Sequence, residues 1–373
     1  MASNRISPAS YSIYAPLRYE ATRPYSVRVG EQYQRYAGMT LTARNKHLIN
    51  DIAPAMRKVM RTAGKPFEGD SILAEVNNLL CFGEFIKGGR VIYDIHRKLT
   101  EALAATDVGD LPVSLLPKPA ESLYLHFGDT DLENEGCRDI EGAFVSWRSI
   151  PGEPETLNIS LATKHAFASP FFWKQNNIEI GNGSMLDIED KNLNILDCLQ
   201  KSLDLVHKNH VEDVAKMEDQ YFQQTGKKIH LPKVTAPEGF LESVQAGAKL
   251  VFKCLLFLSS NSDDYYYDWD DRAPRDIVHS ANHGEKEGTR KTAERTLSNR
   301  DYLKIRFVGR KFAESSTFIN PEHSGSKKSK HVRRGHFRNQ AYGPEHSLRK
   351  VVFIPPMVIN PDSGDDLGRI YES

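Results

Sequence analysis

The chain has 373 residues, enough for two or three ordinary domains or for one large domain with additions. Its 49 lysines and arginines balance 49 aspartates and glutamates, so affinity for nucleic acid would require local segregation of charge. Four widely spaced cysteines form no CxxC pair, and no apolar run is long enough to cross a bilayer. We therefore expect a cytoplasmic protein without a disulfide framework, a metal, a cofactor or a membrane contact.

The first segment, residues 1–38, is rich in tyrosine and arginine and has no sustained hydrophobic period. We expect it to form an extended arm that lies over the body of the protein or over a partner.

Residues 39–110 are predicted to be a helical region. The stretch "SILAEVNNLLCF" carries an apolar stripe at helical spacing, and "RVIYDIHRKLTEALAA" repeats it. The "KGGR" sequence between them favours a turn. The stripe residues are Ile72, Val76 and Leu79 in the first stretch and Ile92, Ile95, Leu99 and Leu103 in the second.

Residues 111–260 are predicted to be an α+β core. Short β-branched and aromatic runs from Ser122, from Gly142 and from Thr156 predict an antiparallel meander of at least three strands. Gly181-Asn182-Gly183 is a typical hairpin-turn sequence. Apolar residues that alternate by four and three from Phe240 to Leu258 then predict a buried packing helix.

Residues 261–322 form an acidic and then a basic segment. The run "SDDYYYDWDD" supplies hard oxygen ligands, but it lacks EF-hand spacing. We therefore favour an acidic loop that pairs with the basic residues after it. His279 and His283 are four residues apart, as zinc ligands on a helix would be, but "HSANHGEKEG" is a poor helix and lacks the glutamate of HExxH.

Residues 323–373 are predicted to be a linker followed by a β-hairpin. The stretch "HVRRGHFR" has no apolar helical stripe, "YGPE" predicts a turn, and "RKVVFIPPMVI" predicts a partner strand that two prolines end. Strand alternation would place Arg334, His336 and Arg338 on one face and His331, Arg333 and Phe337 on the other.

Three interpretations of this hairpin stay open. It is a solvated charged surface, a binding face for RNA or a peptide, or a metal-free RNA-cleavage site with His331 and His336 as acid and base. Alternation turns His331 and His336 to opposite faces, which counts against cleavage. We favour the binding face, because arginine suits phosphate and carbonyl oxygens and aromatic side chains lie nearby. Its expected contact residues are His331, Arg333, Arg334, Gly335, His336, Phe337, Arg338 and Tyr342.

The run "HVRRGHFRNQAYG…RKVVFIPPMVIN" resembles the C-terminal signature of the type V-A anti-CRISPR family that blocks biosynthesis of the type V-A effector nuclease. In that family, a His-x-Arg-Arg-Gly-His-aromatic run precedes a glycine turn and a strand that ends in Val-x-Asn. Weaker similarity in "DIEGAFVSWRSIPGEPETLNISLAT" and "AKLVFKCLLFLSS" extends the resemblance over about residues 110–360. Phe337 stands where tryptophan is usual, and the arm has no counterpart. Similar hairpins occur in uncharacterised phage and plasmid proteins.

The resemblance implies a regulatory inhibitor in the cytoplasm of a bacterial host. Its partners would be the nascent N-terminal peptide of a type V CRISPR effector and the mRNA or the ribosome, and its effect would be to lower effector mRNA and protein. The alternative is a metal-independent ribonuclease or RNA-binding module of phage or plasmid origin. The expected fold is α+β, with a helical N-terminal region, a central antiparallel sheet with a packing helix, and a C-terminal β-hairpin.

Overall fold

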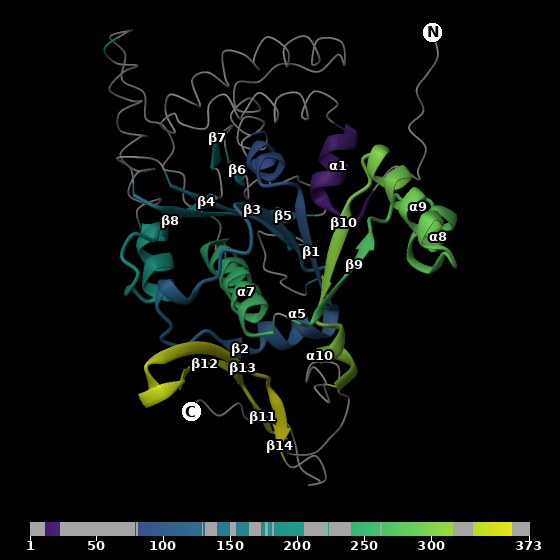
Figure 1. Ribbon diagram of the computed structural model, residues 1–373. Coiled ribbons are helices and arrows are strands. Elements are labelled where there is room, and N and C mark those ends of the chain that lie inside the picture. The colour runs from purple at the N-terminus through teal and green to yellow at the C-terminus, as the bar shows by residue number, and fades with distance from the viewer. Residues whose placement is uncertain are drawn as a thin grey trace.

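The computed structural model describes residues 12–22, 79, 81–128, 130, 140–149, 154–163, 173–175, 178–180, 183–204, 223, 240–261, 263–315 and 331–359. They form an α+β protein built on a large mixed sheet, as the sequence predicts (Figure 1). The named helices are α1 (Ala15–Thr22), α5 (Arg97–Ala104), α7 (Phe240–Ser260), α8 (Arg275–His283), α9 (Glu287–Asn299) and α10 (Arg310–Ser315), with 3-10 turns η3 (Val113–Leu115) and η5 (Pro344–His346). None of the helices within these ranges is long and apolar enough to span a membrane.

The main sheet has seven strands in the order β8-β5-β4-β3-β1-β10-β9. Strand β1 runs parallel to both β3 and β10, and the other neighbouring strands are antiparallel. The predicted meander is confirmed as β3, β4 and β5. The strands of this sheet are β1 (Val91–Ile95), β3 (Ser122–His126), β4 (Ile140–Arg148), β5 (Thr156–Thr163), β8 (Gly183–Asp187), β9 (Tyr265–Trp269) and β10 (Lys304–Val308).

The prediction of one helix from Ile92 to Leu103 is wrong in its first half. Ile92 and Ile95 belong to β1, which lies in the sheet between two parallel neighbours, and only Leu99 and Leu103 lie in a helix, α5. A spacing of three residues between two isoleucines fits a helix, but a run of β-branched and aromatic residues packs well between strands. Tertiary pairing therefore decided the structure of this segment. Ile72 and Val76 of the preceding predicted helix lie outside the described residues.

Helices cover both faces of the sheet. Helices α5 and α7 pack on one face in the largest hydrophobic core, and the predicted packing helix is confirmed as α7. Helix α1 and the helical residues 81–87 pack on the opposite face, where Tyr14, Leu17 and Phe82 are buried (Figure 1). An extended arm is therefore wrong for residues 15–22, which are helical and contribute to a core.

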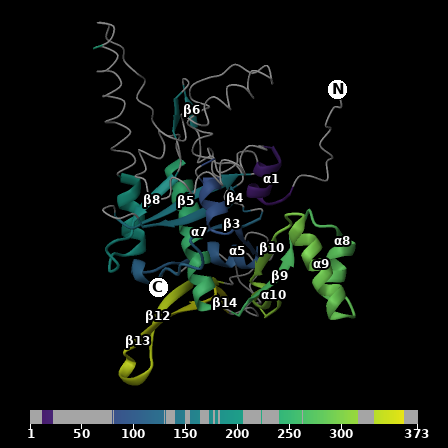
Figure 2. The same cartoon turned by 45° about the horizontal axis from the view of Figure 1, so that its top comes forward.

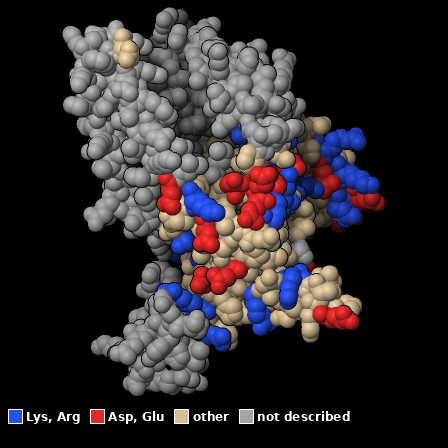
Figure 3. All heavy atoms as spheres, turned by 90° about the vertical axis from the view of Figure 1, so that its left-hand side faces the viewer, with Lys and Arg blue, Asp and Glu red and all other residues tan. Residues whose placement is uncertain are grey.

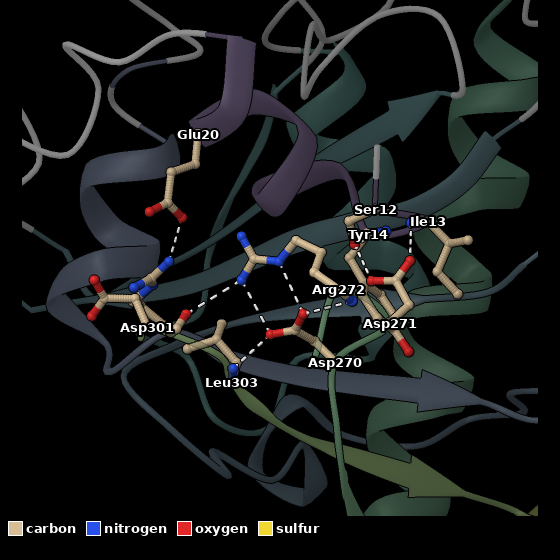
Figure 4. Close-up of polar contacts among 10 residues, drawn as sticks. Ser12, Ile13, Tyr14, Glu20, Asp270, Asp271, Arg272, Asp301 and Leu303 are labelled. Atoms are coloured by element: carbon tan, nitrogen blue, oxygen red, sulfur yellow. Dashed lines mark hydrogen bonds and ion pairs between the residues drawn. The ribbon is translucent and has the colours of Figure 1, made fainter. Parts of the chain in front are cut away.

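The acidic and basic segment is an integral part of the sheet. It supplies the neighbouring strands β10 and β9 and the packed helices α8 and α9. Its aspartates make structural contacts. Asp270 accepts hydrogen bonds from Arg272 and from the main chain of Leu303, and Asp271 accepts bonds from Ser12 and Ile13 before α1 (Figure 4).

The two strands that flank Gly181 and Asn182 do not pair with each other within the residues that the structure describes, so the hairpin predicted there is wrong. Strand β7 (Ile178–Ile180) pairs with β6 (Trp173–Gln175), whereas β8 pairs with β5 at the edge of the main sheet. A turn sequence favours a change of direction but does not select the partner strand, and β5 offered an edge.

The C-terminal hairpin is confirmed as a separate small sheet. Strand β12 (Gly335–Tyr342) pairs antiparallel with β13 (Leu348–Ile354) and parallel with the short β2 (Thr106–Asp107) after α5. Strands β11 (His331–Arg333) and β14 (Met357–Ile359) pair beside it. The turned view shows that the β12–β13 hairpin projects away from the body (Figure 2).

Candidate functional site

The two faces of the β12–β13 hairpin have different environments. The cross-strand register places His336, Arg338, Gln340 and Tyr342 on the same face as Lys350. The intervening residues of β12 share their face with Val351 and Phe353. One face therefore carries the cations Arg338 and Lys350 and the ring of Tyr342 among apolar side chains of β13, and the other face is apolar near the body and carries Arg349 near the turn.

The apolar face anchors the hairpin to α7. Phe337 and Val351 are buried in the main core, and the ring of Phe353 lies 5.2 Å from that of Phe337 and 5.4 Å from that of Phe257 in α7. The expectation that Phe337 contacts a partner is therefore corrected, because its ring is buried inside the protein. An aromatic residue at this position holds the hairpin in place.

The outward face carries cations. Arg338 and Lys350 are exposed, and the ammonium of Lys350 lies 5.4 Å from the centroid of the Tyr342 ring. Arg349 on the opposite face near the turn and Arg333 in β11 are also exposed, and within the described residues none of these four cations forms an ion pair. Figure 3 shows charges of both signs over the side toward which the hairpin turn points, so this group of cations is a local feature of a neutral molecule.

The expected row of side chains on one continuous strand is interrupted at Arg334. This residue lies between β11 and β12, so only His336 and Arg338 of the predicted row share a strand and a face. His331 lies in β11, and its side chain is not among those that the structure describes. The proposed acid-base pairing of His331 with His336 stays a prediction.

Gly335 has a structural role. It is buried where β12 begins beside β2, and a Cβ atom there would lie 2.5 Å from Thr106 Oγ1 and 2.7 Å from Pro356 Cδ. Any side chain would push β12 away from β2. The absence of a side chain at Gly335 therefore lets β12 lie beside β2, and a role of Gly335 in binding stays a prediction.

Lys253 of α7 is a residue that the sequence analysis missed as part of this site. It is buried, and its ammonium donates to the carbonyl of Ala104 at the end of α5 at 3.1 Å. Burial lowers the pKa of Lys253 to about 8. The charge of Asp107 raises this pKa by a smaller amount, and the charge of Arg334 lowers it further. The sequence feature that could have identified Lys253 is the position of a lysine inside the otherwise apolar run "LVFKCLLFLSS". The base of the hairpin thus brings together a buried ammonium, Asp107 and the guanidinium of Arg334.

A cleft of about 400 Å³ lies at the carboxyl ends of the parallel strands β1 and β10. Its lining includes Asp94, Lys98 and Arg310, and ligands often bind at such a point in a sheet. However, Arg310 already pairs with Glu314 at 2.9 Å, and Lys98 donates to a main-chain carbonyl of α10 at 3.3 Å. The cleft therefore presents fewer available charges than the hairpin does.

No group of three or more potential metal ligands occurs among the residues that the structure describes. His279 and His283 do lie on a helix, α8, contrary to the expectation from the sequence, and their rings are 5.1 Å apart. Two imidazoles without a third ligand do not make a structural zinc site.

These features define an α+β protein whose C-terminal hairpin is anchored on its apolar face and cationic on its outward face. The model of the AcrVA2-like family, the anti-CRISPR type V subtype A2 family, matches residues 93–361, and the chain belongs to this family. A crystal structure of AcrVA2 is similar to the chain, with 13% sequence identity and a TM-score of 0.46 over 92% of this chain and 97% of the other. No curated protein matches the chain. The protein is thus a type V-A anti-CRISPR protein that acts on a CRISPR system.

Proposed function

We propose that the protein recognises the nascent N-terminal peptide of a type V CRISPR effector and lowers the level of the effector's mRNA and protein. In this proposal the hairpin contacts RNA, either the mRNA or the ribosome, while the effector peptide is being made. The proposal depends on one observation, the outward face of the hairpin, where Arg338 and Lys350 are exposed and form no ion pair within the described residues.

Physical chemistry supports an RNA contact at this face. Exposed cations with a neighbouring aromatic ring bind the phosphates and bases of single-stranded RNA without sequence preference. Arg338 and Lys350 supply the charge and Tyr342 supplies the ring. A surface of this kind would give affinity for RNA, and selectivity for one message would then come from the peptide that the message encodes.

The test is repression of an effector reporter in bacteria. Synonymous recoding of the first codons should leave repression intact, whereas changing the encoded N-terminal residues should abolish it. If synonymous recoding abolishes repression instead, the protein reads RNA sequence and peptide recognition is refuted. The combined variant Arg338→Gln and Lys350→Gln should lose most of the repression, and Lys291→Gln, an exposed lysine on α9, should retain it.

The alternative, a metal-independent ribonuclease, is tested with the purified protein. A ribonuclease would cleave naked RNA in the presence of EDTA, and His336→Ala would abolish that cleavage while the fold survives. Our proposal expects no cleavage without translation. Cleavage of RNA that encodes no effector would contradict it.

A further inference from the structure

Strand β9 is an edge of the main sheet with an unusual sequence. Within the described part of the chain, β9 pairs only with β10, and it carries three consecutive tyrosines. Tyr265, Tyr266 and Tyr267 are 42%, 40% and 51% exposed. Tyrosine is enriched at protein interfaces, and exposed edges of this kind are normally protected by lysine, proline or a bulge.

The hydrogen-bond pattern identifies which main-chain groups face outward. Gly309 donates to the carbonyl of Asp264, and Asp270 donates to the carbonyl of Leu303. Both pairs fit the antiparallel register of β9 with β10. Because bonded and non-bonded pairs alternate in such a ladder, the main-chain groups of Tyr265 and Tyr267 point away from β10.

The carboxyl end of this edge is covered and hydrogen-bonded, unlike its middle. Helices α8 and α9 lie beside the carboxyl end, where Trp269 packs in their small core (Figure 1). The main-chain N–H of Trp269 is also satisfied, because it donates to the carboxylate of Asp268 at 2.8 Å. The open part of the edge is therefore Tyr265 to Tyr267.

The tyrosine rings are held in fixed positions on both faces of the sheet. The ring of Tyr266 stacks on Phe307 with a centroid distance of 5.1 Å. On the other face the rings of Tyr265 and Tyr267 meet edge to face at 5.7 Å, and the guanidinium of Arg306 lies 5.9 Å from the ring of Tyr267. An added strand would thus meet aromatic walls on both sides of its main chain.

The length of the open edge favours a short extended peptide over a second copy of this chain. The edge is bounded by buried residues, Asp264 before Tyr265 and Trp269 beyond Tyr267. The carboxylate of Asp264 is already occupied, because it accepts from the main-chain N–H groups of Lys311 and Phe312 at 2.9 and 3.0 Å. Affinity at this edge would therefore come from main-chain hydrogen bonds and from contact with the tyrosine rings, which an extended peptide can supply.

We infer that β9 binds the effector's nascent N-terminal peptide as an added strand, with its main chain hydrogen-bonded to Tyr265 and Tyr267 and its side chains against the tyrosine rings. This inference rests on the proposed function, because it assigns a surface to the peptide recognition proposed there. An emerging peptide has no fold of its own and is available in extended form, as strand addition requires.

The test measures binding of a fluorescein-labelled synthetic peptide that has the N-terminal residues of the effector whose recoding abolishes repression. Peptides with single N-methyl groups are compared along their length. Strand addition predicts that affinity falls about tenfold or more at alternate positions and is nearly unchanged at the positions between them. A pattern without this period of two overturns the inference.

The matching protein variant is Tyr267→Pro. Proline removes an outward N–H while leaving the bonds to β10, and it is tolerated on edge strands for that reason. Affinity should again fall about tenfold or more. Tyr267→Thr keeps the N–H and should lose less affinity, and Leu348→Ala, a comparably exposed residue at 48% on β13, should bind as the wild type does.

The outcomes separate the two proposals. If the wild type binds the peptide and Tyr267→Pro binds it equally well, β9 is not the site, and peptide recognition survives. If the wild type binds no peptide, both proposals fail. If sedimentation shows that the wild type is a dimer that Tyr267→Pro dissociates, the edge pairs with a second copy and the inference is overturned.

Discussion

At the scale of single residues, the half-buried Asp94 and the buried Lys253 are held in environments that oppose their charged forms. Burial raises the pKa of Asp94 to about 6, although a hydrogen bond from Tyr14 at 2.7 Å partly offsets that effect. Between about pH 4 and about pH 6 the folded state therefore binds more protons at Asp94 than the unfolded state does. The contribution of this carboxyl to the free energy of unfolding falls as pH rises from about 4 to about 6. Lys253 shows the corresponding effect for a base, because burial lowers its pKa. Removing such groups from water lowers the stability of the folded protein, and groups with shifted pKa values often mark functional positions.

Lys253 provides a pH-dependent prediction. Its pKa is 10.5 in an unfolded chain and about 8 in the folded protein, so the unfolded state binds more protons between these values. The free energy of unfolding of the wild type should therefore rise relative to Lys253→Met over that range, by on the order of 3 kcal/mol. Urea denaturation of both proteins at several pH values measures this difference. A difference that does not change with pH would show that the lysine is exposed to water in solution.

At the scale of elements, the hairpin depends on a small aromatic contact with α7. Phe337 and Phe353 connect β12 and β13 to Phe257, and the rest of the hairpin projects from the body (Figure 2). The outward cations are thus held in position by residues on the opposite face. The sequence predicted the hairpin, its turn and its end at two prolines, because these features depend on neighbouring residues. The sequence did not show that Phe337 faces the core, because alternation assigns residues to faces without saying which face is buried.

Loss of this contact should detach the hairpin. We expect Phe337→Ala to cost about 3–5 kcal/mol if the fold stays cooperative. Hydrogen exchange should become faster in β12 and β13 and stay slow in β4 and β5. Val352→Ala, a half-buried change on the outward face, is the matched control and should affect exchange little. Equal acceleration across the main sheet would show that the hairpin and the sheet unfold as one unit.

At the scale of the whole molecule, distant parts of the chain meet at the turn after β9. The carboxylate of Asp271 accepts bonds from the hydroxyl of Ser12 at 2.6 Å and from the main chain of Ile13 at 2.7 Å (Figure 4). Arg18 of α1 also pairs with Glu141 of β4. These contacts hold α1 over the second core. The seven-stranded sheet is thus completed and covered by segments from both halves of the chain.

Asp271→Ala should therefore loosen α1 specifically. Two hydrogen bonds to a carboxylate are lost, so the free energy of unfolding should fall by about 1–3 kcal/mol. Exchange of the main-chain amides of residues 14–22 should become faster. Asp276→Ala, an exposed aspartate in the first turn of α8, should leave α1 protected. Unchanged protection of α1 in Asp271→Ala would mean that apolar burial alone holds this helix.

The sequence by itself determined the α+β class, the meander β3–β5, the buried helix α7 and the C-terminal hairpin. Each of these has a local hydrophobic period or a turn sequence that neighbouring residues enforce. Tertiary structure alone decided that β1 is a strand, that residues 15–22 are a helix, and that the acidic tyrosine run is the edge of the main sheet. In these segments the local pattern fitted more than one structure, and burial against distant residues selected one of them. Lys253 joined the candidate site for the same reason, because only the fold brings α7 beside Arg334.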